Sequence, residues 1–154
     1  MAWSNSKIFS AFVTDSFNRT NAFDLNSDAP KAALYNNTGT PDQTVTAANS
    51  AYNAGQWVTS NELSNGGWSA GGLALTSVTS TFSSNVYTFD AADTANGSAA
   101  TISGAFGTLV YDSTLSTPVA NQGICFNYFG GTNSVTSGTL SIIWNASGIF
   151  AITL

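Results

Sequence analysis

The sequence predicts a mainly β protein, either an antiparallel β-sandwich or a jelly-roll-like barrel, with one or two short helices near the amino terminus. Two observations predict this fold class. The 154 residues include 20 Thr, 21 Ser and 16 Asn, which disfavour helices because they compete for backbone hydrogen bonds, whereas Thr suits a pleated strand. Short apolar segments between Gly, Asn, Ser and Asp recur in the second half, as in sandwiches and barrels. We expect residues 1–154 to form a single β-domain, because this length fits one hydrophobic core.

The first predicted element is a helix over residues 7–17. Asn5 or Ser6 is placed to cap its start. We describe residues 1–20 as an N-terminal helical arm, whose apolar stripe packs on the chain's own sheet, the simpler interpretation, or docks on a neighbouring subunit. The apolar positions recur at helical spacing: Ile8, Phe9, Phe12, Val13 and Phe17.

The next segments contain turn signals. Residues 31–35 (KAALY) precede the turn sequence NNTGTPD, and residues 45–52 form a short predicted helix with Thr44 or Thr46 near its cap. Residues 61–72 are rich in glycine and predict a long loop that carries Trp68. A tryptophan in a loop either contacts a partner or folds back on the sheet.

Strands dominate the rest of the chain. Residues 139–144 alternate apolar and polar side chains, residues 145–148 (NASG) form a turn, and residues 149–154 resume as an apolar strand. This pattern predicts a C-terminal hairpin that ends in the core. The predicted strands cover residues 73–82, 86–90, 100–102, 108–111, 123–129, 139–144 and 149–154.

Charge excludes two classes of partner. Only 7% of the residues are charged, the net charge is −5, and the three cations are Lys7, Arg19 and Lys31. These few cations cannot neutralise a nucleic-acid backbone or an acidic membrane surface, so we expect neither partner. Neutral hydroxyl and amide groups must then solvate most of the surface.

The sequence contains no convincing chemical site. There is no His to activate a nucleophile, and Cys125 lies in the apolar pattern GICFNYF, which is typical of a buried thiol. The nearest acid pairs, Asp90 with Asp93 and Asp24 with Asp28, are typical of turns. Residues 24–28 begin like a calcium loop, but Ala29 and Tyr35 replace its glycine and glutamate. We therefore expect no enzyme, no cofactor and no metal.

Sequence motifs along nearly the whole chain resemble those of a group of small virion proteins of tailed bacteriophages. The most specific part is the ending, where an aromatic-Gly-Gly turn at residues 129–131 is followed by SVTSGT and by a last strand after NASG. These motifs are structural. The phrases are KAALYNNTGTPD, TAANSAYNAGQW, WSAGGLALTSVT, YTFDAADT, GTLVYD, NQGICFNYFGG and SVTSGTLSIIWNASGIFAITL.

The resemblance implies a head decoration protein or minor capsid protein, with a tail protein as the second possibility. It implies a virion location after synthesis in the host cytoplasm. On this basis we expect a homo-oligomer, with a trimer favoured, that binds the major capsid protein or other virion proteins through aromatic side chains. The predicted interface residues are Trp3, Phe9, Phe12, Trp57, Trp68, Tyr128 and Phe150.

Two alternatives remain at this point. A tail or fibre adhesin would bind a host-surface glycan by stacking sugar rings on Trp57, Trp68 and Tyr128. A hydrolase would use one of the acid pairs in general acid–base chemistry. Aromatic residues beside polar loops more often serve packing than sugar binding, and the acid pairs lie in turn sequences, so the structural protein is favoured over both.

Overall fold

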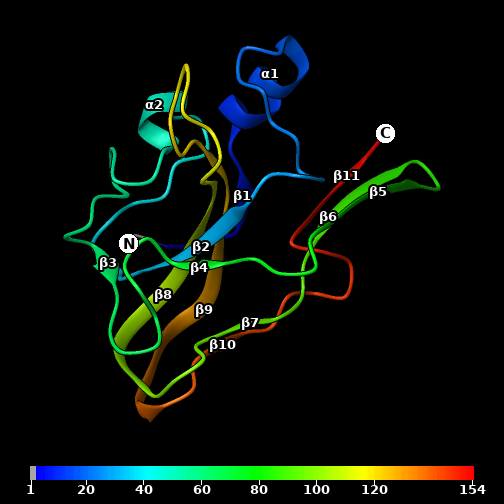
Figure 1. Cartoon of the computed structure of the whole chain (residues 1–154). Helices are drawn as coiled ribbons and strands as arrows, with labels where there is room; N and C mark the ends of the chain where they lie inside the picture. Colours follow the sequence, from blue (N-terminus) through cyan, green and yellow to red (C-terminus); the bar gives the residue numbers. More distant parts are fainter. Residues whose placement is uncertain (1–2) are drawn as a thin grey trace.

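The computed structural model describes residues 3–154, and its centre is one long pair of antiparallel strands (Figure 1). Strands β8 (Ala100–Asp112) and β9 (Gly123–Gly138) run side by side through the molecule. Their pairing shifts register at four points, which marks β-bulges that bend and twist the pair. One end of this pair lies in the hydrophobic core, whereas the other end is largely exposed.

Four shorter strands complete the main sheet, in the order β1-β9-β8-β2-β3 with β4 also pairing with β2. All of the pairings are antiparallel. Strand β2 is the most buried of the short strands because it lies between β8 on one side and β3 and β4 on the other. The bounds are β1 (Lys7–Ile8), β2 (Pro30–Tyr35), β3 (Glu62–Leu63) and β4 (Leu73–Ala74).

Two small sheets lie beside the main one. Strands β5 (Thr79–Ser83), β6 (Val86–Asp90) and β11 (Phe150–Thr153) form a three-stranded sheet in the order β11-β6-β5. Strands β7 (Thr94–Ala95) and β10 (Ser141–Ile142) form a pair. Figure 1 shows the three-stranded sheet extending away from the long β8–β9 pair.

The two helices differ in how they begin. Helix α2 (Ala47–Ser50) is capped as predicted, since Thr46 accepts a hydrogen bond from the backbone N–H of Asn49. Helix α1 (Ser10–Asn18) starts later than predicted and has no side-chain cap. The reason is that Lys7 and Ile8 pair with Phe126 and Cys125 as strand β1, so the backbone there is extended.

An aromatic cluster at the centre of the core ties the N-terminal segment to the main sheet. The Trp57 ring is the hub of this cluster, with the Tyr35 and Trp3 rings at centroid distances of 5.1 and 5.7 Å and the Phe9 and Phe126 rings at 6.0 and 5.9 Å. Most of these contacts are edge-to-face, the geometry that aromatic rings prefer. The segment therefore packs on its own sheet, which is the simpler of the two interpretations of its apolar stripe.

Several strand boundaries differ from prediction. Residues 73–82 contain two strands, β4 and β5, whereas the predicted strands 100–102 and 108–111 are parts of the single strand β8. Strand β9 continues nine residues beyond the predicted end at residue 129, to Gly138. Gly104 in β8 and Gly130 in β9 have φ values of +79° and +78°. Glycine adopts this conformation readily and allows a strand to bend without ending. In the sequence such a glycine resembles the end of a strand, and the predicted strands were therefore too short.

The predicted C-terminal hairpin is wrong, although its turn exists. Gly148 N–H donates to the Asn145 carbonyl at 2.7 Å, which closes the turn. Strand β10, however, pairs with β7, and β11 pairs with β6. Asp93 and Thr94 hold Trp144 through its backbone N–H and its indole N–H, so the chain before the turn belongs to a different sheet from the chain after it.

The predicted fold class is confirmed. Residues 3–154 are mainly β, all of the sheets that they form are antiparallel, and they include two short helices before residue 51. The arrangement is β-sandwich-like.

Candidate functional site

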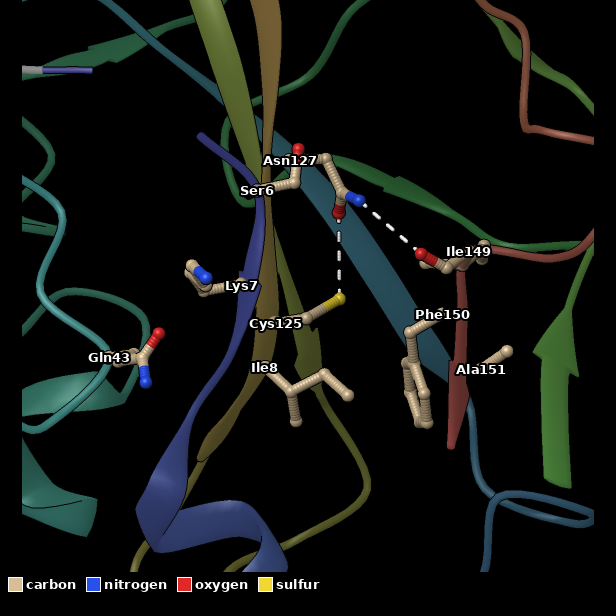
Figure 2. A pocket seen from close by; sticks show the side chains of 9 residues that line it. All are labelled: Ser6, Lys7, Ile8, Gln43, Cys125, Asn127, Ile149, Phe150 and Ala151. Atoms are coloured by element: carbon tan, nitrogen blue, oxygen red, sulfur yellow. Dashed lines mark hydrogen bonds between the residues drawn. The ribbon is translucent and has the colours of Figure 1, made fainter. Parts of the chain in front are cut away.

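The cleft between β1 and β11 holds the only cysteine of the chain (Figure 2). It has a volume of about 400 Å³. The Cys125 thiol lies 3.5 Å from the amide oxygen of Asn127, whose amide nitrogen donates to the Ile149 carbonyl at 3.4 Å. Burial raises the pKa of the Cys125 thiol, so the sulfur stays protonated and is a poor nucleophile.

The acid pairs singled out in the sequence are engaged in hydrogen bonds with the chain's own backbone and side chains. Asp90 accepts a hydrogen bond from the Ala91 N–H at 2.9 Å, and Asp93 accepts one from the Trp144 N–H at 3.0 Å. Asp24 accepts from the Ser27 hydroxyl and from the Asn26 N–H, and both bonds lower the pKa of Asp24. Asp24 and Asp90 thus stabilise local backbone turns, whereas Asp93 holds a segment that lies 51 residues later in the chain.

No group of three or more His, Cys, Asp or Glu side chains arranged to hold a metal ion occurs within residues 3–154. The four-residue spacing of Asp24 and Asp28 does create a compact loop, because Asp24 N–H donates to the Asp28 carboxylate at 2.6 Å. That loop is held by its own hydrogen bonds.

Six of the seven predicted interface residues are buried in the chain's own core, which corrects the sequence expectation. None of them is more than 8% exposed, so they cannot reach a partner without unfolding. The physical reason is that large aromatic rings bury more apolar surface than other side chains, so the chain uses them to build its core. The six are Trp3, Phe9, Phe12, Trp57, Trp68 and Phe150.

Trp68 illustrates this correction. Its loop folds back through a two-way backbone pairing with Asn65, at 2.9 and 3.1 Å, and its side chain is fully buried. Tyr128 is the only one of the seven that keeps partial exposure. It stacks on Phe106 with a centroid distance of 6.5 Å.

The best candidate site is an apolar groove that the sequence did not predict. It has a volume of about 550 Å³ and lies between helix α1, residues 23–26 and the three-stranded sheet. We name it the α1 groove. Its lining residues are Phe12, Val13, Ser16, Phe17, Phe23, Asp24, Leu25, Asn26, Ser80, Phe82, Tyr87, Ile152 and Leu154.

The floor of the α1 groove is firmly packed. The Phe12 ring lies edge-to-face on Phe23 at a centroid distance of 4.8 Å and on Phe150 at 6.0 Å. Phe150 in turn packs on Tyr87 and on Phe89 of strand β6. The helix is therefore fixed to the sheet from below, so the groove is part of the folded structure.

The rim of the α1 groove exposes large apolar side chains. Phe17 is 79% exposed, Phe82 is 60% exposed and Leu154 is 77% exposed. Within residues 3–154, only one further large apolar side chain, Ile143, is comparably exposed. Scattered exposed apolar residues are normal, but their gathering around one depression is typical of a protein-binding surface.

An open strand edge borders the same groove. Strand β5 pairs only with β6 in the sheet order β11-β6-β5, so its outer edge has no strand partner among the described residues. Four of its five residues are exposed. A partner segment can therefore add main-chain hydrogen bonds at this edge and place apolar side chains in the groove.

Asp24 is the only charged side chain that lines the α1 groove. A partner protein must therefore be held at the α1 groove by apolar contacts and backbone pairing, with little electrostatic contribution. Sequence periodicity placed Phe17 on a helix and Phe82 on a strand, but it could not show that the two lie on one rim. The signal that was available is that both aromatics stand among polar neighbours, in DSFNR and STFSS.

A second depression lies around Tyr128. It has a volume of about 510 Å³ and combines two aromatic rings with amide and hydroxyl groups. Ile143 contributes to its wall. The polar and aromatic lining residues are Tyr128, Phe129, Asn133, Ser134, Thr139 and Ser141.

Comparison with known proteins adds no relative: no protein-family model, no curated protein and no solved structure matches the chain. Across residues 3–154, neither helix is long and apolar enough to span a membrane.

Proposed function

We propose that this protein is a non-enzymatic structural component of a tailed-bacteriophage particle, a capsid decoration or minor capsid protein. In this proposal it binds the major capsid shell through the α1 groove and assembles as a homo-oligomer, with a trimer favoured. The observation that carries the proposal is the clustering of Phe17, Phe82 and Leu154 around one groove. The tailed-phage particle is proposed because the sequence motifs resemble those of small virion proteins.

The low charge of the chain supports a permanent assembly rather than a transient encounter. Only 7% of the residues are charged, so long-range electrostatic steering toward a partner is weak. Apolar burial and edge pairing do not need such steering. Many copies that engage together then compensate for the modest affinity of one small groove.

The test is binding to capsid shells that lack the protein, measured by sedimentation of shells with purified protein. Replacing Phe17 and Phe82 together by Ser removes the exposed part of the rim. We expect at least about a tenfold loss of affinity, since each buried aromatic contributes about 1.5–3 kcal/mol and tenfold corresponds to about 1.4 kcal/mol. Ile143→Ser is the matched control because Ile143 is equally exposed but lies outside the groove.

Salt gives a second readout of the same binding. Because apolar contacts dominate the α1 groove, binding of the unmodified protein should persist at about 1 M NaCl, where charge interactions are screened within roughly 3 Å. Unchanged binding of the double variant, or loss of binding only with Ile143→Ser, would refute the assignment of the groove.

The second candidate function is a tail or fibre adhesin domain that binds a host-surface glycan. The depression around Tyr128 favours it, because an aromatic ring beside neutral amides and hydroxyls suits a sugar. Two of the three predicted stacking residues, Trp57 and Trp68, are buried, which weakens it. A glycan array probed with the unmodified protein and with Tyr128→Ala tests this alternative, which requires a signal that the variant loses.

A further inference from the structure

The hydrogen bonds between strands β5 and β6 alternate in a phase that their turn sets. The turn consists of Ser84 and Asn85, whose φ values of +50° and +62° are those of a type I′ hairpin. In such a hairpin the residues that flank the turn, here Ser83 and Val86, exchange main-chain hydrogen bonds. Along the two strands, every second residue pair after this one does so again.

Ser80 and Phe82 are the residues of β5 whose backbone faces away from the sheet. They lie opposite Phe89 and Tyr87, which are the positions without hydrogen bonds in this alternation. In agreement, the Ile149 N–H donates to the Phe89 carbonyl at 2.8 Å, so Phe89 bonds toward β11 instead of β5. The N–H and C=O groups of Ser80 and Phe82 therefore point to the open edge, where no strand among residues 3–154 pairs with them.

Strand β5 lacks the features that keep natural edge strands from pairing with other chains, which are charged side chains, proline and β-bulges. Its sequence, TSTFS, has no charge and no proline, and its register with β6 is continuous over residues 79–83. The opposite edge of the sheet differs, because β11 faces β1 across the cleft of Figure 2. The sheet extends away from the β8–β9 pair (Figure 1), so other copies of the chain can reach the open edge of β5.

The sequence of β5 is complementary to itself about its central residue, Thr81. Antiparallel pairing of two copies about a two-fold axis at Thr81 covers all 5 residues of each strand. Ser80 then lies opposite Phe82 of the second copy, so a small side chain faces a large one, and these pairs exchange the hydrogen bonds of their outward backbone groups. Thr81 meets its own counterpart, which is a favourable cross-strand pair, and no like charges meet.

We propose that two copies of this chain pair through their β5 strands and form one continuous antiparallel sheet in the order β11-β6-β5-β5-β6-β11. The inference rests on the proposed function in one respect, since it names a contact within the proposed homo-oligomer. A two-fold contact closes after two copies, so a trimer would need a further contact elsewhere on the chain.

The pairing also affects the α1 groove. The two-fold axis between antiparallel strands is perpendicular to the sheet, so residues directly opposite one another have their side chains on the same face. Ser80 and Phe82 line the α1 groove, and the pairing therefore places the grooves of both copies on one face. Two grooves that bind a shell together hold it more tightly than one groove does.

The first test is the mass of the full chain in solution, measured by light scattering over a series of concentrations. Ser80→Pro removes an outward N–H and leaves the bonds between β5 and β6 in place, as proline is tolerated on edge strands. We expect this variant to have half the mass of the unmodified chain. Ser80→Ala is the matched control: both variants lose the hydroxyl that is bonded to Tyr87, but Ser80→Ala keeps the N–H and should keep the mass.

A disulfide across the two-fold axis gives a second readout. The Cα atoms of a non-hydrogen-bonded antiparallel pair lie about 4.5 Å apart, within the range of about 4.4–6.8 Å that a disulfide allows. Oxidised glutathione should therefore link Thr81→Cys chains into a covalent dimer on a non-reducing gel. Thr88→Cys is the matched control, because Thr88 is opposite Thr81 on β6 and would lie roughly 14 Å from its counterpart. Cys125 is buried, so the unmodified chain should stay unlinked.

The inference is overturned if folded Ser80→Pro, checked by circular dichroism, keeps the mass of the unmodified chain. It is also overturned if Thr81→Cys forms no more covalent dimer than Thr88→Cys, and this comparison decides if Ser80→Pro does not fold. An unmodified chain that is monomeric at every concentration overturns it as well, and the edge would then be open to a strand of a different protein. Because no capsid shell enters these tests, a failure to bind shells would refute the proposed function and leave the pairing intact.

Discussion

Phe17 in the last turn of α1 and Phe82 in the outer strand β5 border one groove, and both side chains are mostly exposed. The two rings come from distant parts of the sequence, and the buried Phe12 ring of α1 packs on the Phe150 ring of β11, which belongs to the same sheet as β5. The groove is thus a permanent feature of the fold, and its exposed rim contributes little to the stability of the single chain. This separation of floor and rim leads to the first prediction.

Floor and rim substitutions should differ in their effect on stability. Phe12→Ala removes a buried ring and should lower the free energy of unfolding by about 3–5 kcal/mol. Phe17→Ser should change it by less than about 0.5 kcal/mol, because Phe17 is 79% exposed. Urea denaturation measures both values, and a large loss for Phe17→Ser would show that the rim serves folding instead of binding.

Gly107 should not tolerate a methyl group. A Cβ there would lie 2.3 Å from the Trp3 ring and 2.5 Å from the Asn127 carbonyl oxygen. Trp3 is held in place because its indole N–H donates to the Asn36 carbonyl at 3.0 Å, so the clash cannot relax easily. Gly107→Ala should lower the free energy of unfolding, measured by heat or urea, by about 1–3 kcal/mol.

Gly97→Ala is the control for that substitution. Nothing lies within 4 Å of a Cβ at Gly97. Gly97→Ala should therefore lower the free energy of unfolding by less than about 0.5 kcal/mol. Equal effects of the two substitutions would contradict the packing of Trp3 on the β8–β9 pair.

Gln122 should be required for the packing of the segment after α1. Its side chain is fully buried, accepts from the Asn21 amide at 2.6 Å and donates to the Asp15 carboxylate at 2.8 Å. Gln122→Leu removes the hydrogen-bond partner of the Asn21 amide and of the Asp15 carboxylate. We therefore expect the free energy of unfolding, measured in urea, to fall by about 1–3 kcal/mol. Gln43→Leu should lower the free energy of unfolding much less, because the Gln43 side chain makes no hydrogen bond with any of residues 3–154. A similar loss for the two variants would disprove the network.

Stability should fall in alkaline solution. Burial raises the pKa of Tyr35 and Tyr111, and burial together with the hydrogen bond to Glu62 raises the pKa of Tyr52 to about 12. The unfolded chain loses these protons near pH 10, at about the ordinary tyrosine pKa. The folded chain therefore keeps more protons, and its stability is complete below about pH 10 and decreases as the pH rises toward 12.

Tyr52→Phe tests this effect at one position. The variant should show a shallower fall in the free energy of unfolding between about pH 10 and 12, because one of the raised groups is gone. Urea unfolding at several pH values gives the slope. An unchanged or steeper slope would mean that the Tyr52–Glu62 pair does not contribute to the decrease in stability with rising pH.

The sequence predicted the fold class and many elements because those depend on local signals. Residues 86–90 form a strand as expected, and Thr46 caps α2. Pairing was harder to predict. The turn at Asn145–Gly148 is real, but Asp93 and Thr94 hold Trp144 from more than 40 residues away, and no local pattern reveals that contact.

The candidate site was largely beyond sequence reasoning for a physical reason. Aromatic residues were assigned to an interface because the surface is poor in charge, yet Trp3, Phe9, Trp57 and Trp68 were needed for the core. The side chains left exposed are ones that tertiary structure alone brings together.

The most direct test of the proposed capsid role is a reconstruction of purified phage particles from the source of this sequence, at a resolution that places the strands of the chain. We predict density for the chain on the capsid shell, with Phe17 and Phe82 covered by a capsid subunit or by a neighbouring copy. Absence of the chain from the particle, or a bound chain whose α1 groove faces solvent, would contradict this assignment.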